Sequence, residues 1–489
     1  MANPKVAIKY KKIFINNEFI DSKSGKTFTS ISPVNESVVA EIAEGDKADV
    51  DAAVRAAKAA FEYGSEWRNL QPAQRAILLN KLGDLVDRDA EQIASIQTLE
   101  NGKVYAQSFG EVKIAANVFR YYAGWCDKVH GETLPTDNGQ LVITRKEPIG
   151  VVGQIVPWNA PILLLALKWA PALAVGCTIV LKPAEQSSLC TLHITALTKE
   201  AGFPKGVINV VLGYGPTVGA AVSEHPDIVK VTFTGSTEVG KKIMIASGKS
   251  NLKRVTLELG GKSPLVICDD VNVDEAVNIA HEAIFSNSGQ ICVAASRTYV
   301  HSKIYDEFVK KSKELALKRK LGDPFDSTVA QGPQVDKKIF NRVMNYIKIG
   351  KESGAKLETG GERFGTVGYY IKPTVFSNVT DDMVIAKEEI FGPVQQILKY
   401  ENFDDVIKRA NNTTYGLGAG IITNDINKAL KFSQAIESGS VWVNQYAALT
   451  PSAPFGGYKQ SGIGRELGPD ALENYLQTKT ISIKLTPPA

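Results

Sequence analysis

The chain has 489 residues, which is too long for one ordinary hydrophobic core and predicts two or three domains. Hydrophobic residues make up 44% of the chain and charged residues 22%, a mix typical of soluble globular proteins. The net charge is only +4 and no basic cluster is present, which argues against nucleic acid or an anionic membrane as the main partner.

The cysteines and the first residues favour a reducing compartment. The five cysteines are widely spaced and include no CxxC pair, so we expect neither a disulfide framework nor a zinc site. Residues 1–20 contain no long apolar run and no arginine-rich amphipathic stretch, so we expect no signal or transit peptide. The predicted location is the cytoplasm.

The first predicted elements are a hairpin and a set of helices. The stretch IFINNEFI (13–20) has two β-like runs around Asn16-Asn17, which predicts a tight turn. Apolar residues at helical spacing predict helices over 46–63 and 71–102. The second helix is expected to end at Asn101-Gly102, because glycine is common just after a helix.

After residue 149 the pattern changes to short β-branched runs, most of them separated by helical segments. This alternation predicts a parallel, doubly wound α/β sheet. The most apolar stretch, 160–181, is interrupted by Lys168 and two prolines, so we interpret it as a buried helix and strand and not as a membrane span. The runs lie at 150–157, 178–183, 207–213, 228–235, 254–261 and 263–270.

A second α/β series is predicted from 297 to 444. Gly260-Gly261 comes before it and is a candidate hinge or domain boundary. Two further strands, at 139–148 and 478–486, alternate apolar and polar residues and stand apart from both series.

Cys292 lies among small and polar residues in the stretch FSNSGQICVAASR. A free cysteine is most often a small core residue, and the alternative is a nucleophile, which needs a base and donors for an oxyanion. None of the five histidines falls in a nucleophile motif. Glu258, at the end of a β run, could be the base, although its spacing alone favours an outward-facing side chain.

Three more segments are candidates for ligand contacts. Gly235 and Gly240 follow a strand and open a helix, a context that presents N–H groups to phosphate but lacks the usual dinucleotide fingerprint. Lys182 and Glu185 follow another strand, where open α/β sheets bind ligands, although they could equally form a surface pair. Asn159, in PWNAP, could donate to an oxyanion or be an ordinary turn residue.

Together these segments resemble the aldehyde dehydrogenase superfamily, most closely its class 1/2 cytosolic, retinal-dehydrogenase-like NAD-dependent members. The resemblance extends from IFINNEFIDSKSGKTF to ENYLQTKTISI, nearly the whole chain. Its most specific stretches, in chain order, are PWNAP, LKPAEQ, FTGSTEVG, VTLELGGKSP, GQICVAASR, KEEIFGPV and PFGGYKQSGIGRELG.

The resemblance implies an α/β fold in three parts: a Rossmann-like NAD-binding domain, an α/β catalytic domain that bears the thiol, and a small β oligomerisation domain. The implied boundaries are 1–125 and 149–260 for the first and 261–460 for the second, and residues 126–148 and 461–489 are oligomerisation and bridging segments. It also implies a homotetramer, a dimer of dimers, in which strands of the small domain pair across subunits.

The resemblance further implies a reaction that needs no metal. Cys292 would attack the aldehyde carbonyl, and hydride transfer to NAD would leave a thioester that water, activated by Glu258, hydrolyses. The Asn159 amide and the Cys292 backbone N–H would hold the oxyanion. Lys168 and Glu466 match positions proposed to relay the proton to solvent.

The implied cofactor contacts centre on the ribose hydroxyls and the pyrophosphate. Lys182 and Glu185 would bind the adenine ribose, and the carboxylate of Glu185 would repel a 2′-phosphate, so NAD is preferred over NADP. The ribose-binding glutamine of many relatives aligns with Ile339, so that contact is not expected. The full implied set is Ile155, Val156, Pro157, Trp158, Lys182, Glu185, Gly215, Phe233, Gly235, Ser236, Val239, Leu259, Gly260, Glu389 and Phe391.

The implied substrate tunnel is wide and apolar. Ala160 stands where many relatives have a phenylalanine, and Phe455 is the one aromatic expected on the far wall. Such a tunnel favours retinal, isoprenoid, long-chain or aromatic aldehydes and disfavours betaine aldehyde and semialdehydes that carry a carboxylate. The implied lining is Ala160, Leu164, Leu167, Phe285, Ile291, Val293, Leu449 and Phe455.

Two other functions remain as alternatives. The first is a structural relative that keeps the fold without the activity, which the intact set of Cys292, Glu258 and Asn159 argues against. The second is a CoA-acylating dehydrogenase, in which a glutamate base is dispensable, so Glu258 favours hydrolysis.

Overall fold

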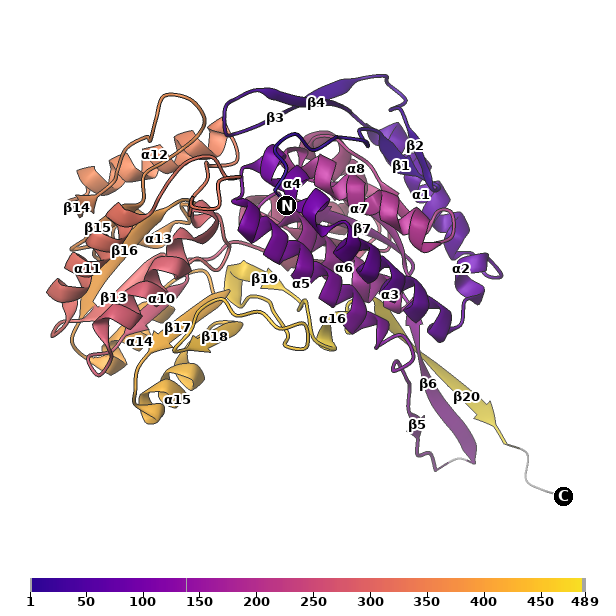
Figure 1. The fold of residues 1–489 in the computed structure, drawn as a ribbon. Helices are drawn as coiled ribbons and strands as arrows, with labels where there is room; N and C mark the ends of the chain where they lie inside the picture. Colours follow the sequence, from indigo (N-terminus) through magenta and orange to yellow (C-terminus); the bar gives the residue numbers. More distant parts are fainter. Residues whose placement is uncertain (1, 138, 486–489) are drawn as a thin grey trace.

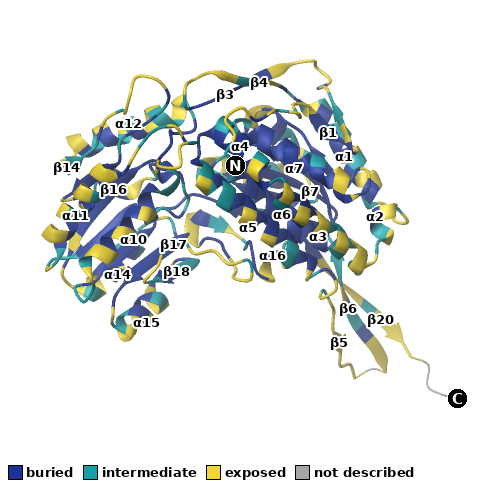
Figure 2. Cartoon of the chain, viewed as in Figure 1, coloured by how far each residue is buried: buried dark blue, intermediate teal, exposed yellow. Residues whose placement is uncertain are grey.

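The computed structural model describes residues 2–137 and 139–485. Figure 1 shows two α/β bodies side by side and a thin β arm that extends away from the first body. The first body is built on an eight-stranded sheet, the second on a seven-stranded sheet, and the arm is a three-stranded sheet. Figure 2 shows that the strands of the two bodies are mostly buried, whereas the arm is largely exposed. This arrangement confirms the predicted fold class.

The first sheet has the order β19-β11-β10-β7-β8-β9-β1-β2, and its five central strands are parallel. The predicted hairpin is confirmed, with Asn16 and Asn17 in left-handed conformation at φ 55° and 65°. The strands are β1 (Ile13–Ile15), β2 (Glu18–Ile20), β7 (Val151–Val156), β8 (Thr178–Pro183), β9 (Ile208–Val210), β10 (Lys230–Thr234), β11 (Arg254–Glu258) and β19 (Gly462–Ile463). A separate antiparallel pair consists of β3 (Thr27–Ile31) and β4 (Val38–Ala43).

Helices cover both faces of this sheet. Gln154 of β7 donates to the Lys168 carbonyl of α6 on one face, whereas Thr178 of β8 donates to the Ala57 carbonyl of α1 on the other. The helices are α1 (Lys47–Phe61), α2 (Glu66–Asn69), α3 (Pro72–Arg88), α4 (Ala90–Asn101), α5 (Tyr105–Ala123), α6 (Pro161–Ala174), α7 (Ser188–Ala201), α8 (Ala220–Glu224) and α9 (Thr237–Lys249). Short helical turns lie at η1 (Glu185–Ser187) and η2 (Gly215–Gly219).

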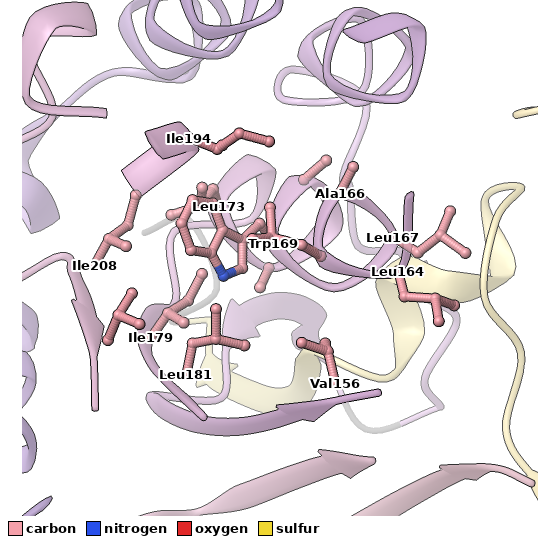
Figure 3. Packing of buried hydrophobic residues seen from close by; sticks show 14 of the residues in the cluster. Val156, Leu164, Ala166, Leu167, Trp169, Leu173, Ile179, Leu181, Ile194 and Ile208 are labelled. Carbon is pink, nitrogen blue, oxygen red and sulfur yellow. The ribbon is translucent and has the colours of Figure 1, made fainter. Parts of the chain in front are cut away.

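The apolar stretch 160–181 is a buried helix and strand, as predicted. It forms α6 and β8, and Trp169 of α6 packs against Ile179 and Leu181 in the core (Figure 3). Across residues 2–137 and 139–485, the structure contains no helix long and apolar enough to cross a membrane.

The helix expected over 71–102 is two helices, α3 and α4. Asp89 breaks them with φ −93° and ψ 11°, and its carboxylate pairs with Arg88 and His193. The predicted end of α4 is confirmed by Gly102, which is left-handed at φ 77°.

The second sheet has the order β14-β15-β16-β13-β12-β17-β18 and is parallel except for β14. Its strands are β12 (Pro264–Ile267), β13 (Arg297–His301), β14 (Lys356–Thr359), β15 (Thr374–Ser377), β16 (Val394–Tyr400), β17 (Gly418–Ile422) and β18 (Ser440–Val443). Its helices are α10 (Val273–Phe285), α11 (Tyr305–Lys318), α12 (Lys337–Glu352), α13 (Val384–Lys387), α14 (Phe403–Asn411) and α15 (Ile426–Ala435). The chain changes sheet between Glu258 and Pro264, around the Gly260-Gly261 pair.

The arm contains the two predicted strands that belong to neither α/β series. β20 (Leu476–Lys484) pairs antiparallel with β6 (Gln140–Pro148), and β5 (Thr133–Leu134) lies on the other side of β6. β20 is thus an edge strand, and residues 486–489 of the predicted oligomerisation segment lie outside the described residues.

The first part of the predicted oligomerisation and bridging segment 461–489 lies against the first body. Within residues 461–475, β19 pairs with β11 at the edge of the first sheet. The short helix α16 (Asp470–Glu473) packs against α6 in the same body. The turn η4 (Lys459–Ser461) precedes β19, and the Ser461 hydroxyl donates to the Gly260 carbonyl, which ties this segment to the end of β11.

Candidate active site

Cys292 is the one cysteine of the chain that is not buried. It follows the short turn η3 (Ser286–Gly289) and packs at the edge of the first body's core, beside Ile291 and Val293. Its surroundings still disfavour a charge: desolvation, followed by the nearby carboxyls of Glu258 and Glu389, raises the pKa of the thiol to about 12. The thiol is therefore protonated at neutral pH and needs a neighbouring base to become a nucleophile.

Glu258 is buried, with only 6% of its surface exposed, so the outward-facing interpretation is wrong. Desolvation and then repulsion by Glu466 raise the pKa of its carboxyl well above the usual value, against the opposing effect of Lys168. Its Oε2 atom has no hydrogen-bond partner among the described residues. A buried carboxyl with a raised pKa and a free oxygen is suited to accept a proton, and its neighbour Cys292 carries one.

A polar cluster lies behind Glu258 on the same face of the sheet. Lys168 is fully buried on α6, forms an ion pair with Glu466 and donates to the Thr232 hydroxyl at 3.2 Å. Thr232 pairs in register with Thr256, two residues before Glu258, so all three strand residues face α6. The two residues predicted to relay the proton are thus in direct contact.

Asn159 lies just before α6, next to the segment that carries the thiol. Its Nδ2 donates to the Gln290 carbonyl at 3.1 Å, two residues before Cys292. The neighbouring Trp158 carbonyl accepts from Asn101 at 3.1 Å. Asn159 is 8% exposed, and these contacts fix its position beside the thiol loop.

A cavity of about 630 Å³ opens at the carboxyl ends of β7, β8 and β10. This is where open α/β sheets bind dinucleotides. Ten of the fifteen predicted cofactor residues line it: Ile155, Val156, Pro157, Trp158, Lys182, Glu185, Gly215, Phe233, Gly235 and Val239. Lys242 and Lys338 also line it, although no sequence motif marks them; Lys338 comes from α12 of the second body.

Glu185 contacts two other residues that line this cavity. Its carboxylate pairs with Lys182 at 3.1 Å and accepts from the Gly215 N–H at 3.3 Å. Desolvation lowers the pKa of Lys182, and the Glu185 carboxylate opposes that shift. Ser236 does not line the cavity itself but caps α9 by accepting from the N–H of Val239, which does line it.

The four remaining predicted cofactor residues do not line this cavity. Phe391 meets Trp158 edge to face, with ring centroids 5.5 Å apart. Glu389 accepts from the Gly261 N–H at 3.1 Å, and a β-carbon on Gly260 would collide with the Glu389 carboxyl. Leu259 is buried against Gly240 of α9.

Most of the apolar residues predicted to line a tunnel belong to the core of the first body, against which Cys292 packs. Leu164, Leu167, Val293 and Phe455 belong to one core cluster, with Ala160, Ile291 and Cys292 packed against it. Leu449 lies in the loop after β18 and is 37% exposed.

Two predictions about this wall are wrong. Phe285 is fully buried at the end of α10, where its ring packs on His281 at 4.7 Å inside the second body, so it belongs to a different cluster. Phe455 is not the one aromatic on its side, because Tyr446 packs beside Cys292 and donates its hydroxyl to the Val293 carbonyl at 2.8 Å.

The histidines have other partners. His193 pairs with Asp89, and His281 contacts Arg319; desolvation, followed by the charge of Arg319, lowers the pKa of His281 to about 4. None of the described histidines hydrogen-bonds to Cys292, so a Cys-His hydrolase has no support. Across residues 2–137 and 139–485, no three His, Cys, Asp or Glu side chains lie close enough together to hold a metal ion.

Comparisons with known proteins agree with this geometry. Residues 19–481 match the model of the Aldehyde dehydrogenase family. "Aldehyde dehydrogenase, cytosolic 1" of Mus musculus is 55% identical over 99% of this chain and 97% of its own. "Aldehyde dehydrogenase 1A1" of Gallus gallus is 56% identical over 98% of this chain and 94% of its own.

Solved structures give the same result. The NAD+ complex of an aldehyde dehydrogenase from Bacillus cereus superposes with a TM-score of 0.96 at 48% identity and covers 98% of this chain and 97% of that one. The chain therefore belongs to the aldehyde dehydrogenase family and is an NAD-dependent oxidoreductase that acts on aldehydes.

Proposed function

We propose that the chain oxidises an aldehyde to the carboxylic acid through a thioester on Cys292. The observation that carries this proposal is the pairing of one accessible thiol with one buried carboxyl, Glu258, that has a free oxygen. NADH formation from a simple aldehyde without added CoA tests it, since a CoA-acylating enzyme would stop after one turnover.

In the first half of the reaction the Cys292 sulfur bonds to the carbonyl carbon, and the thiol proton passes to Glu258. The carbonyl oxygen becomes an oxyanion, which the Asn159 amide and the Cys292 backbone N–H stabilise. The cavity that Lys182 and Glu185 line would hold NAD, which would supply the hydride acceptor, and loss of hydride from this carbon would leave it on sulfur as a thioester.

In the second half Glu258, after passing the thiol proton to solvent, takes a second proton from water, and the hydroxyl adds to the thioester carbon. The carbon–sulfur bond then breaks, which releases the acid and a thiolate, and a proton from solvent restores the thiol. The raised pKa of Glu258 suits this step, because a stronger base removes a proton from water more readily. Lys168 and Glu466 would carry that proton onward.

Glu185 should set the choice of cofactor. We expect Glu185→Gln to improve the use of NADP relative to NAD, because the carboxylate that would repel a 2′-phosphate is gone. The change should be about tenfold or more in the ratio of kcat/KM values. Steady-state kinetics with both cofactors measures it, and Glu224→Gln, a second carboxylate on the rim of the same cavity, is the matched control. A ratio that is unchanged or lower for Glu185→Gln would refute the role.

We propose that the substrate is a bulky apolar aldehyde, of the retinal, isoprenoid, long-chain or aromatic type. Ala160, just before α6, and Leu164 and Leu167 on α6 would line this site with small or aliphatic side chains and no charge. Tyr446 narrows one side of this space, and its hydroxyl is occupied by the Val293 carbonyl.

The substitution Ala160→Phe tests that proposal. A phenyl ring at the start of α6 should fill the space that a bulky aldehyde needs. We expect kcat/KM for retinal to fall by about tenfold or more, while propanal is used at least as well. Ala221→Phe, a partly buried alanine on α8, controls for added bulk elsewhere. Equal losses on both aldehydes would show that Ala160 does not line the substrate site.

We propose a homotetramer, assembled as a dimer of dimers, in the cytoplasm. Two faces of the chain support self-association: the free edge of β20, with Ile483 45% exposed, and an apolar hollow around Met244, Ile245 and Ile463. Two independent faces can close a symmetric tetramer. The location rests on relatives that are named cytosolic.

Deleting the chain from Thr478 onward removes most of β20 and leaves one edge of β6 unpaired along most of its length. We expect species smaller than a tetramer, or insoluble protein, and a loss of activity. Light scattering of the full-length and shortened chains measures the mass. A full-length chain that is a stable monomer at micromolar concentration would contradict the tetramer.

A further inference from the structure

Three consecutive residues before the thiol adopt a left-handed backbone. Asn287, Ser288 and Gly289 have φ of 49°, 57° and 74°. Two of them are not glycine, and a left-handed conformation costs such residues energy unless the surroundings impose it. Asparagine tolerates this conformation better than most residues, but three consecutive left-handed residues are rare. Such strained turns are concentrated at functional sites.

The outer side of this turn is bound to the segment before α12. Ser288 donates its hydroxyl to the Gly332 carbonyl at 2.9 Å, and Gln334 donates to the Ser288 carbonyl at 3.1 Å. Gln290 accepts from the Val335 N–H at 2.9 Å. These contacts anchor the turn in the second body.

The inner side is bound to the loop that carries Asn159. The Asn287 amide donates from Nδ2 to the Asn159 carbonyl at 3.0 Å and to the Gln290 carbonyl at 3.2 Å. The Asn159 amide donates to that same Gln290 carbonyl at 3.1 Å. One side-chain amide thus joins the Asn159 loop of the first body to the segment that leads into Cys292.

This junction determines the geometry of the proposed oxyanion site. The two donors, the Asn159 amide and the Cys292 N–H, lie on chain segments that are more than a hundred residues apart. A primary amide has two N–H groups. One N–H group of the Asn159 amide donates to the Gln290 carbonyl. The other N–H group of the same amide can then donate to the carbonyl oxygen of a substrate.

We propose that Asn287 is a positioning residue, which sets the distance and orientation between Asn159 and Cys292. The inference rests on the proposed function of Asn159 as an oxyanion donor. Asn287 touches neither substrate nor cofactor in this proposal; it acts through Asn159 and the Gln290 carbonyl. Because a donor displaced by an ångström can cost about a hundredfold in rate, its loss should be visible in catalysis.

The test is Asn287→Gly, which keeps the left-handed backbone and removes the amide. We expect kcat/KM for aldehyde to fall by about tenfold to a hundredfold, with the Kd for NAD and the thermal unfolding midpoint unchanged. Asn16→Gly is the matched control, since Asn16 is a left-handed asparagine in the β1–β2 turn, far from the thiol. It should keep the wild-type kcat/KM.

Asn159→Ala and the double variant distinguish positioning from a general structural role. If Asn287 acts through Asn159, the double variant is about as slow as Asn159→Ala alone; multiplied losses would overturn the proposal. An Asn287→Gly enzyme with the wild-type kcat/KM for aldehyde would also overturn the proposal. Should that variant fail to fold, Asn287→Asp repeats the test, because aspartate tolerates the same backbone but places an acceptor against two carbonyls. Full activity of Asn159→Ala would instead refute the oxyanion role itself.

Discussion

Cys292→Ala should abolish NADH formation from every aldehyde and leave NAD binding intact. The sulfur forms the bond to substrate, whereas the cavity around Lys182 and Glu185 is unchanged, so binding and chemistry separate. We expect kcat to fall on the order of 10⁴-fold or more, as when other covalent nucleophiles are removed. Absorbance at the NADH band measures turnover, and titration of protein fluorescence measures NAD binding.

The matched control for this variant is Cys126→Ala. Cys126 is buried, and its thiol contacts the Tyr122 carbonyl, so its removal tests the loss of a thiol without touching the site. It should turn over aldehyde at the wild-type rate. NADH formation by pure Cys292→Ala protein at a rate near wild type would rule out the covalent mechanism.

Glu258→Gln should separate the two halves of the reaction. The variant keeps the thiol and the cofactor cavity but has no base for water, so the thioester accumulates. We expect a burst of NADH near one equivalent per active subunit, followed by turnover slowed about 10²- to 10⁴-fold. The burst itself should be slower than in wild type, because Glu258 also accepts the thiol proton. Stopped-flow absorbance resolves the two phases.

Glu200→Gln is the control, because Glu200 is an exposed carboxylate paired with Arg88 on the far side of the first body from the thiol. Its steady-state rate should equal that of wild type. If Glu258→Gln also matched wild type at saturating aldehyde, Glu258 could not be the base.

The strands of the fold could be predicted because β-branched runs and glycine turns mark their ends. The break at Asp89 could not, since the residues around it favour a helix and the turn is fixed by a contact with His193, a hundred residues away in sequence. The pairing of β6 with β20 is equally non-local: neither strand shows in its own sequence which partner it takes.

The residues of the site could be predicted where a sequence motif marks them. They could not be predicted where tertiary packing determines whether a side chain is buried or which residues it contacts. The alternation that places Glu258 with Thr256 is typical of a solvent-facing side of a strand, but α6 and Lys168 cover that side and bury it. Tyr446 was missed because it lies in a loop with no motif of its own. Phe285 was expected in the tunnel only from the family resemblance, yet it ends a helix whose apolar face points into the second body.

The central claim is that the oxidised substrate is held as a thioester on Cys292, and it can be tested on Glu258→Gln protein. The protein is mixed with NAD and propanal, quenched in acid after the burst, and examined by mass spectrometry, intact and after digestion. We expect one propanoyl group per active chain, located on the peptide that contains Cys292. NADH formed in the burst without any acyl group on the protein, or with the acyl group on another residue, would contradict the mechanism.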